Sequence, residues 1–338
     1  MRYLGNAWYQ AAWSDEVVAD GLLGRTLLDR PVVFFRDAEG AIVALDDRCP
    51  HRFAPLSRGR VKDGTLYCGY HGLGFDATGG CSHNPHGPIP KRAAVRRYPA
   101  LERHDAIWIW PGDPARADPA LLPDLGFIDV TPATAKLHGY LRTAANYQLL
   151  SDNILDLSHA DYLHPDTLGG IMTKAAVNVA EQEGRLSIRW DAPSVEPPPA
   201  FKAMVPEGKA DIWTEVTWTA PAVMILNTGA VPTGQTPSDS DQNYVLHNMT
   251  PETASASHYF YCPTRRNRLD DAAFTAVLKQ FLDQAFLSED KPMIEAQQSR
   301  METPDLFALK PVLLSVDAGA IRARRMLQRR IDAESAND

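Results

Sequence analysis

Two short boxes near the start of the chain each pair a cysteine with a histidine. One residue separates Cys49 from His51, and two residues separate Cys68 from His71. In such a set, two thiolates can hold one iron of a 2Fe–2S cluster while two imidazoles hold the other iron. The neutral imidazoles raise the reduction potential above that of an all-cysteine cluster. The boxes therefore predict an electron-transfer centre.

Zinc is the alternative metal, because two cysteines and two histidines also suit a tetrahedral structural site. Zinc modules usually place two cysteines close together and two histidines close together, whereas each box here supplies one of each. The spacing therefore favours a Rieske 2Fe–2S cluster. Neither box contains a further cysteine that could join the two loops by a disulfide, so we expect a cluster of lower, ferredoxin-like potential.

A second group of candidate ligands lies in the back half of the chain. His159 and His164 are five residues apart. Two histidines and a carboxylate typically hold the non-haem Fe(II) that activates O2, with coordination positions left open. A five-residue offset turns a straight helix by about 140°, so both histidines can reach one metal only if the helix is bent or bulged.

Two further polar residues share the helix face of His159, since Asn153, Asp156 and His159 recur every three residues. Asp156 could accept a hydrogen bond from the ring nitrogen of His159 that does not hold iron, which is the usual arrangement behind a metal-bound histidine. The alternative is that Asp156 only caps or solvates the helix. We expect Asp156 and Asn153 to belong to the catalytic site.

The carboxylate ligand is predicted in a late helix. Asp290 falls on a helical stripe of apolar residues, namely Leu278, Leu282, Phe286, Met293 and Ile294. A lone carboxylate on an apolar face is costly unless it is paired or binds a cation, and Pro292 perturbs this turn of the helix. Asp290 is therefore the predicted third iron ligand. Glu289 as the ligand, or a salt bridge to Lys291, is the alternative.

Length and composition bound the class of protein. A chain of 338 residues predicts two domains, and 44% hydrophobic with 22% charged residues is typical of a globular protein. The net charge of −8 disfavours nucleic acid as a partner. We expect no membrane span and a cytoplasmic location, because apolar runs are short and no signal region opens the chain. The remaining cysteines, Cys81 and Cys262, predict no disulfide framework.

The elements that must position these residues fall into two parts. Short strands at residues 24–28, 32–36, 41–45 and 106–110 predict an N-terminal all-β Rieske domain, and the proline-rich linker 111–123 places its boundary near residue 120. The predicted domains are thus 1–120, with the cluster, and 121–338, with the mononuclear iron.

The second domain is predicted to be α+β, with an antiparallel sheet surrounded by helices. A helix is expected over about 146–164 and further helices from 270 to the end. Between them lie five strand candidates, at 185–190, 212–219, 222–227, 243–248 and 257–262. The proline-rich segment 193–206 is interpreted as a surface loop, with a lid over a pocket as the alternative. The arginines from Arg322 to Arg330 are interpreted as a solvated helix face, with a docking patch as the alternative.

Together the motifs resemble the terminal oxygenase component of the Rieske non-haem iron oxygenases. Similarity extends over nearly the whole chain, including 6–9, 49–52, 70–73 and 108–113, and is greatest to the vanillate and dicamba O-demethylase group. The resemblance implies oxidation of an aromatic substrate by O2, with electrons from NAD(P)H delivered by a reductase and possibly a ferredoxin. O-demethylation of a methoxylated aromatic acid to a phenol and formaldehyde is the predicted reaction.

The resemblance also implies a homotrimer in which the cluster of one subunit feeds the iron of its neighbour, with Asp156 linking His71 of one chain to His159 of the next. Asn227 and His247 resemble polar pocket residues that orient an aromatic acid, with ordinary strand hydrogen bonds as the alternative. Phe281 stands where the dicamba enzyme has a tryptophan. The loss of an indole donor and the altered pocket volume argue against dicamba itself as the substrate.

Two other functions remain open at this point. The same iron could hydroxylate an aryl methyl group or an aromatic ring, and formaldehyde release separates these outcomes from demethylation. A Rieske electron carrier or redox sensor would lack the mononuclear metal. It would hold about two irons per chain, where an oxygenase holds about three.

Overall fold

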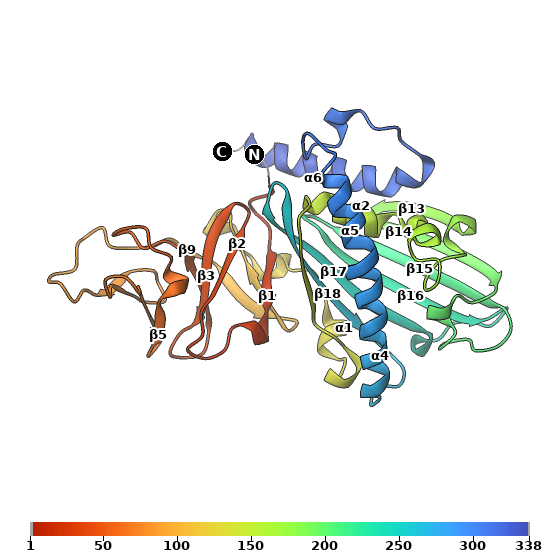
Figure 1. Ribbon diagram of the computed structural model, residues 1–338, viewed down its shortest axis with the longest axis horizontal. Coiled ribbons are helices and arrows are strands. Elements are labelled where there is room, and N and C mark those ends of the chain that lie inside the picture. Colours follow the sequence, from red (N-terminus) through yellow and green to blue (C-terminus); the bar gives the residue numbers. More distant parts are fainter. Residues whose placement is uncertain (1–2, 337–338) are drawn as a thin grey trace. The chain divides into compact units, whose positions relative to one another are not determined.

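The structure is a computed structural model that describes residues 3–336. The chain forms two compact units, Met1–Leu122 and Pro123–Asp338. The first is built from strands and the second from one large sheet with helices (Figure 1), so the predicted α+β class with an all-β N-terminal part is confirmed. In the described residues, no helix has both the length and the apolar character needed to cross a membrane.

The N-terminal unit contains three small antiparallel sheets, with strand orders β1-β11-β10, β2-β3-β4-β9 and β5-β6-β7-β8. Alternating apolar residues of β3 and β4 face inward and meet the cysteine-bearing loops in one buried cluster. The strands are β1 Tyr9–Trp13, β2 Leu23–Leu27, β3 Arg30–Arg36, β4 Ile42–Asp46, β5 Arg60–Lys62, β6 Thr65–Tyr67, β7 Gly74–Phe75, β8 Cys81–His83, β9 Arg97–Tyr98, β10 Ala100–Arg103 and β11 Ala106–Ile109.

The C-terminal unit is organised by a seven-stranded antiparallel sheet of order β12-β18-β17-β16-β15-β14-β13. Its long central strands β15, β16 and β17 pair in continuous register. The sequence missed two strands, β12 and β13, which are the edges of this sheet. The strands are β12 Gly139–Thr143, β13 Ala176–Gln182, β14 Arg185–Val195, β15 Ala210–Thr219, β16 Val223–Pro232, β17 Gln242–Thr253 and β18 Ala256–Thr264.

Helices cover one face of this sheet, and Figure 1 shows α4 and α5 running in one line across it near β17 and β18. Between them, the segment Asp283–Asp290 is a π-helix. Met293, expected on the buried stripe, is 50% exposed because the wider turns of the π-helix shift the phase of the stripe. The helices are α1 Gly126–Asp129, α2 Tyr147–Leu155, α3 Ala160–Leu163, α4 Ala272–Leu282, α5 Lys291–Gln298 and α6 Ala318–Ser335.

The helix predicted over 146–164 is interrupted, as the histidine spacing requires. Helix α2 ends at Leu155, Asp156 is extended, and a 3-10 turn over Leu157–His159 leads into α3. Asn146 caps the start of α2 by accepting from the N–H of Gln148. The break at Asp156 redirects the chain, so that the two histidines no longer follow the phase of one straight helix.

Helix α6 packs on α2 through a largely buried ion pair. Arg324 is 7% exposed, and its guanidinium donates to the carboxylate of Asp152 at 2.6 Å and to the side chain of Gln148 at 3.0 Å. The interpretation of the arginine run as a solvated face is therefore wrong for Arg324, although Arg322 and Arg330 are exposed.

Candidate metal centres

The two cysteine boxes form two similar loops in the N-terminal unit. In the first, the N–H of Cys49 donates to the carbonyl of Ala54 at 2.9 Å. In the second, the N–H of Cys68 donates to the carbonyl of Leu73 at 2.8 Å, and Gly72 takes the positive φ that closes the turn. Both cysteines are buried free thiols at the base of their loops.

The four side chains of these loops fit a mixed-ligand cluster. The rings of His51 and His71 lie with centroids 4.5 Å apart. Burial and the adjacent thiol of Cys68 raise the pKa of Cys49, and the backbone amides of His51 and Arg52 oppose this rise only in part. Two adjacent buried thiolates would therefore require a cationic centre between them. Two buried sulfurs with two imidazoles nearer the surface match the ligand set of a Rieske cluster.

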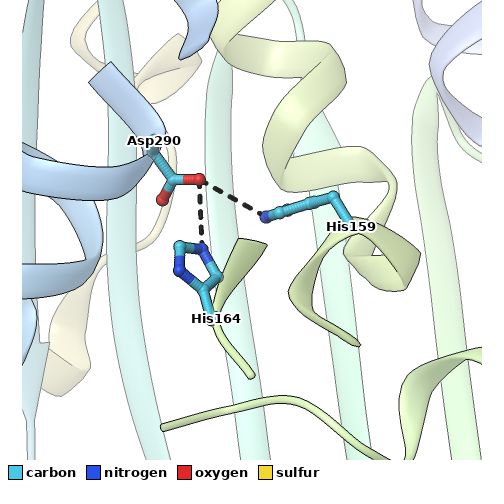
Figure 2. Close-up of side chains that lie close together, drawn as sticks. All are labelled: His159, His164 and Asp290. Atoms are coloured by element: carbon cyan, nitrogen blue, oxygen red, sulfur yellow. Dashed lines mark hydrogen bonds and ion pairs between the residues drawn. The ribbon is translucent and has the colours of Figure 1, made fainter. Parts of the chain in front are cut away.

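A second centre is formed by His159, His164 and Asp290, whose ligand atoms all lie within 4.8 Å of one another. Oδ1 of Asp290 lies 3.1 Å from Nε2 of His164 and 3.5 Å from Nε2 of His159 (Figure 2). Donors held about 2.1 Å from one metal, at right angles to each other, lie about 3 Å apart. The two distances from the carboxylate to the imidazoles are therefore close to those expected for neighbouring ligands of one metal ion.

The outer nitrogen of each ring is committed to an oxygen acceptor. Nδ1 of His159 lies 2.5 Å from the main-chain carbonyl of Asp156, which can only accept, so Nδ1 carries the proton. Nδ1 of His164 lies 2.5 Å from Oε2 of Glu289. When the rings are neutral, the lone pairs of both Nε2 atoms therefore face the Asp290 carboxylate. Three electron-rich groups this close together are stable only with a cation between them.

The electrostatics of His164 agree with this requirement. Its ring is 2% exposed, and burial alone would lower its pKa. The carboxylates of Asp290 and Glu289 outweigh burial and raise the pKa above the ordinary value. Positive charge, whether from a proton or from a metal ion, is thus favoured at this position.

The side chain of Asn153 contacts the metal ligands, whereas the side chain of Asp156 does not. The side-chain amide of Asn153 donates to Oδ1 of Asp290 at 3.1 Å and lies 3.3 Å from Nε2 of His159. The carboxylate of Asp156 was expected to hold the His159 ring, and this is wrong. It accepts instead from the N–H of Ser158 and caps the 3-10 turn.

The triad lies at the wall of a largely apolar cavity of about 210 Å³. His247 and Phe281, both predicted pocket residues, line this cavity. So do Phe201 and Met204 from the proline-rich segment 193–206, which is therefore a wall of the cavity and not merely a surface loop. Other apolar lining residues are Ile154, Leu157, Leu168, Met172, Leu226, Val245, Leu278, Leu282 and Phe286.

Asn227, the remaining predicted pocket residue, faces the opposite side of the sheet. Successive residues of a strand alternate between faces, and Leu226 and Thr228 line the cavity while Asn227 does not. Its amide instead contacts the indole N–H of Trp213 at 3.1 Å and the side chain of Gln242 at 3.0 Å. The expectation that Asn227 contacts a ligand in the cavity of the triad is therefore wrong.

Comparison with known proteins assigns both units. Residues 7–99 match the Rieske [2Fe-2S] domain, and residues 143–333, more than half of the chain, match the vanillate O-demethylase oxygenase C-terminal domain. The chain belongs to the Rieske non-haem iron oxygenases. This oxygenase is 38% identical to the oxygenase component of dicamba O-demethylase from Stenotrophomonas maltophilia, over 99% of the chain and 100% of the relative.

Other relatives and solved structures agree. The oxygenase is 38% identical to the toluene-4-sulfonate monooxygenase iron-sulfur subunit TsaM1 from Comamonas testosteroni, over 98% of both chains. It is 34% identical to a vanillate O-demethylase oxygenase subunit from a Pseudomonas species, over 90% of this chain and 95% of the relative. A crystal structure of dicamba monooxygenase with non-heme iron and dicamba superimposes with a TM-score of 0.87 at 35% identity, covering all of both chains.

The predicted membership and cofactor types are thereby confirmed: this enzyme uses a Rieske 2Fe–2S cluster and a mononuclear non-haem iron. Sequence reasoning missed the contact of Glu289 with His164. It weighed Glu289 only as a replacement for Asp290 and Lys291 as a salt-bridge partner of Asp290, whereas Lys291 lies near Glu295 at 3.6 Å. The one available signal was that Glu289 adjoins Asp290 in sequence.

Proposed function

We propose that this oxygenase removes the methyl group of a methoxylated aromatic acid, yielding a phenol and formaldehyde. One O2 and two electrons are consumed, and the second oxygen atom leaves as water. The electrons come from NAD(P)H through a reductase, with or without a ferredoxin. The observation that carries the proposal is one largely apolar cavity with the ligand triad at its wall, lined also by His247 and by the polar residues Arg265 and Arg268.

Each residue has a stated task in the proposal. His159, His164 and Asp290 hold Fe(II), which supplies O2 activation for oxidation of a nearby C–H bond. Apolar side chains such as Phe281 and Leu226 hold the aromatic ring and exclude water, so that the methyl group stays beside the metal. His247 meets the polar substituent of the substrate. Cys49, His51, Cys68 and His71 hold the cluster that supplies electrons.

The cluster and the iron are proposed to cooperate between chains of a homotrimer. His51 is exposed and His71 partly exposed, so the imidazole edge of the cluster is accessible to a neighbouring chain. In the proposal, the carboxylate of Asp156 meets His71 of the neighbouring chain, while the main-chain carbonyl of Asp156 accepts from Nδ1 of His159 in its own chain. Its oxygens have room for this role, since the contact to the N–H of Ser158 uses only one of them. The four free thiols suit the reducing cytoplasm as its location.

The experiment is turnover by the purified chain with a reductase, NADH, O2 and a panel of methoxylated benzoates, with formaldehyde and phenol measured together. We expect equal amounts of both products and about three irons per chain. His159→Ala should retain the Rieske electron paramagnetic resonance signal and lose formaldehyde release. Benzylic or ring alcohols without formaldehyde would overturn demethylation in favour of hydroxylation, and an unaffected His159→Ala variant would overturn the assignment of the iron.

A further inference from the structure

His247 has an unused ring nitrogen at the cavity. The side chain is 2% exposed and lines the cavity, and Nε2 has no hydrogen-bond partner within residues 3–336. Buried polar atoms in folded proteins nearly always have a partner. A nitrogen left unpaired on the wall of this largely apolar cavity, which Arg265 and Arg268 also line, therefore marks a position where a bound molecule completes the hydrogen bonding.

The other ring nitrogen is held by Tyr259. Its hydroxyl lies 2.6 Å from Nδ1 of His247, and the two rings are stacked with centroids 5.9 Å apart. Phe286, from the π-helix that also carries Asp290, packs against both rings, and Tyr261 packs against Phe286. Contacts with these aromatic rings and the hydrogen bond to Tyr259 thus restrict rotation of His247.

Counting protons decides which nitrogen of His247 carries the hydrogen. If Tyr259 donates to Nδ1, then Nε2 carries the proton, and only that one group is unpaired. If Nδ1 donates to Tyr259, both the hydroxyl hydrogen and the Nε2 lone pair are unpaired, because the hydroxyl has no second partner in the described part of the chain. Since each unpaired buried group costs about 1–3 kcal/mol, the first arrangement is favoured.

Neither group changes its protonation near neutral pH. Burial lowers the pKa of His247 to about 3, an effect that the charge of Asp290 only partly opposes. Burial also raises the pKa of Tyr259 well above its ordinary value. The imidazole is therefore neutral and the phenol protonated at and around neutral pH. The direction of their hydrogen bond does not change over this pH range.

We propose that Tyr259 is a positioning residue that fixes His247 as a hydrogen-bond donor toward the cavity, so that the site selects aromatic substrates carrying an acceptor oxygen at that point. The inference rests on the proposed function for the identity of the cavity as the substrate site. A carboxylate or sulfonate oxygen is the best occupant, because a charged acceptor forms the stronger hydrogen bond. The rest of the cavity wall then favours an apolar ring.

Equilibrium binding without O2 or reductant tests the selection. The probes are the three methoxybenzoates and the matching methylanisoles, in which a methyl group replaces the carboxylate, and the protein is the full chain with both metal centres loaded. We expect the best benzoate to bind about tenfold more tightly than its methylanisole. This ratio should fall to near one in His247→Leu, and at least threefold in Tyr259→Phe.

The matched control is Tyr261→Phe, which removes a hydroxyl from the same aromatic group without touching His247. The Tyr261 hydroxyl lies beside Asp283, and burial together with that carboxylate raises its pKa to about 12. The benzoate preference should be unchanged in this variant. A preference that survives in Tyr259→Phe, or disappears equally in Tyr261→Phe, would overturn the proposal.

A readout independent of any ligand is the tautomer itself. In the full chain with ¹⁵N-labelled histidine, an oxidised cluster and Zn²⁺ at the triad, we expect the His247 proton on Nε2, unchanged down to about pH 4. Tyr259→Phe should give a mixture of tautomers. A proton on Nδ1 in the wild type would overturn the proposal even if formaldehyde is produced. If the tautomer and the binding ratio are as expected but no formaldehyde is produced, this proposal is supported and the proposed demethylation is wrong.

Discussion

Glu289 and Asp290 contact opposite nitrogens of the same imidazole ring. Oε2 of Glu289 lies 2.5 Å from Nδ1 of His164, and Oδ1 of Asp290 lies 3.1 Å from its Nε2. Consecutive residues of a regular α-helix point about 100° apart, but these two end the π-helix, whose wider turns change the directions of both side chains. Glu289 thus aligns the ring of His164, and the opposite side of the ring faces the metal position that His164 shares with Asp290.

Glu289→Gln is expected to weaken iron binding at the triad by about 10- to 100-fold, because the carboxylate that orients His164 and increases its basicity is lost. Iron titration of the metal-free triad measures the affinity, and the spectrum of the 2Fe–2S cluster should be unaffected. Asp283→Asn is the matched control, since Asp283 begins the same π-helix and contacts Lys279 instead. Equal affinities in wild type and Glu289→Gln would contradict the orienting role.

Removing the mononuclear iron by a chelator should destabilise the C-terminal unit. Without a cation, the lone pairs of His159 and His164 face the Asp290 carboxylate. A metal present at about 100 times its Kd stabilises the folded state by about 2.7 kcal/mol. Calorimetry should show a lower Tm for the apo protein, restored by Fe²⁺ or Zn²⁺. The chelator should not change the Tm of the Asp290→Ala variant. A lower Tm in that variant after chelation would mean that the chelator has removed the 2Fe–2S cluster.

Arg324→Met is expected to lower the free energy of unfolding by about 3 kcal/mol, because it leaves the carboxylate of Asp152 unpaired between α2 and α6. Chemical denaturation measures the loss. Arg330→Met on the exposed side of α6 should change stability by less than about 0.5 kcal/mol. Similar losses in both variants would mean that the helix as a whole, and not the ion pair, carries the stability.

The N-terminal unit should lose stability in acid through Glu102. Hydrogen bonding to Arg36 lowers the pKa of this carboxyl below its ordinary value. Since the folded-state pKa is the lower one, the pair stabilises the fold at pH values above the unfolded pKa, and the stabilisation is lost as pH falls through the folded pKa. Glu102→Gln should therefore be less stable than wild type at pH 7, and the difference should disappear in acid, once the pH is below the folded-state pKa of Glu102. A difference that persists there would contradict the assignment.

Residue types and spacing were sufficient to predict most of both metal centres. Cys49, His51, Cys68 and His71 have few alternative uses at that spacing, and the histidine offset required the break that the structure has at Asp156. The late carboxylate could be found because Asp290 interrupts an apolar stripe. Each of these patterns involves residues that are close together in sequence, so each could be recognised without the structure.

What the sequence did not predict depends on geometry. The π-helix has no composition of its own, so the phase shift that exposes Met293 and brings Glu289 to His164 could not be derived from the α-helical period. The carbonyl of Asp156, rather than its carboxylate, holds His159 because the backbone turns there. Asn227 was placed in the pocket by resemblance, and it lies on the opposite face because a shift of one residue along a strand reverses the face of every side chain.

That reversal gives a direct test of the cavity. Leu226→Ala removes an apolar contact from the cavity wall, and we expect KM for the aromatic substrate to rise roughly tenfold. Asn227→Ala removes contacts to Trp213 and Gln242 on the opposite face, and should lower Tm with KM unchanged. Steady-state kinetics and thermal unfolding on both variants decide the matter. A higher KM in Asn227→Ala alone would mean that substrate binds on the other face of the sheet, away from the triad.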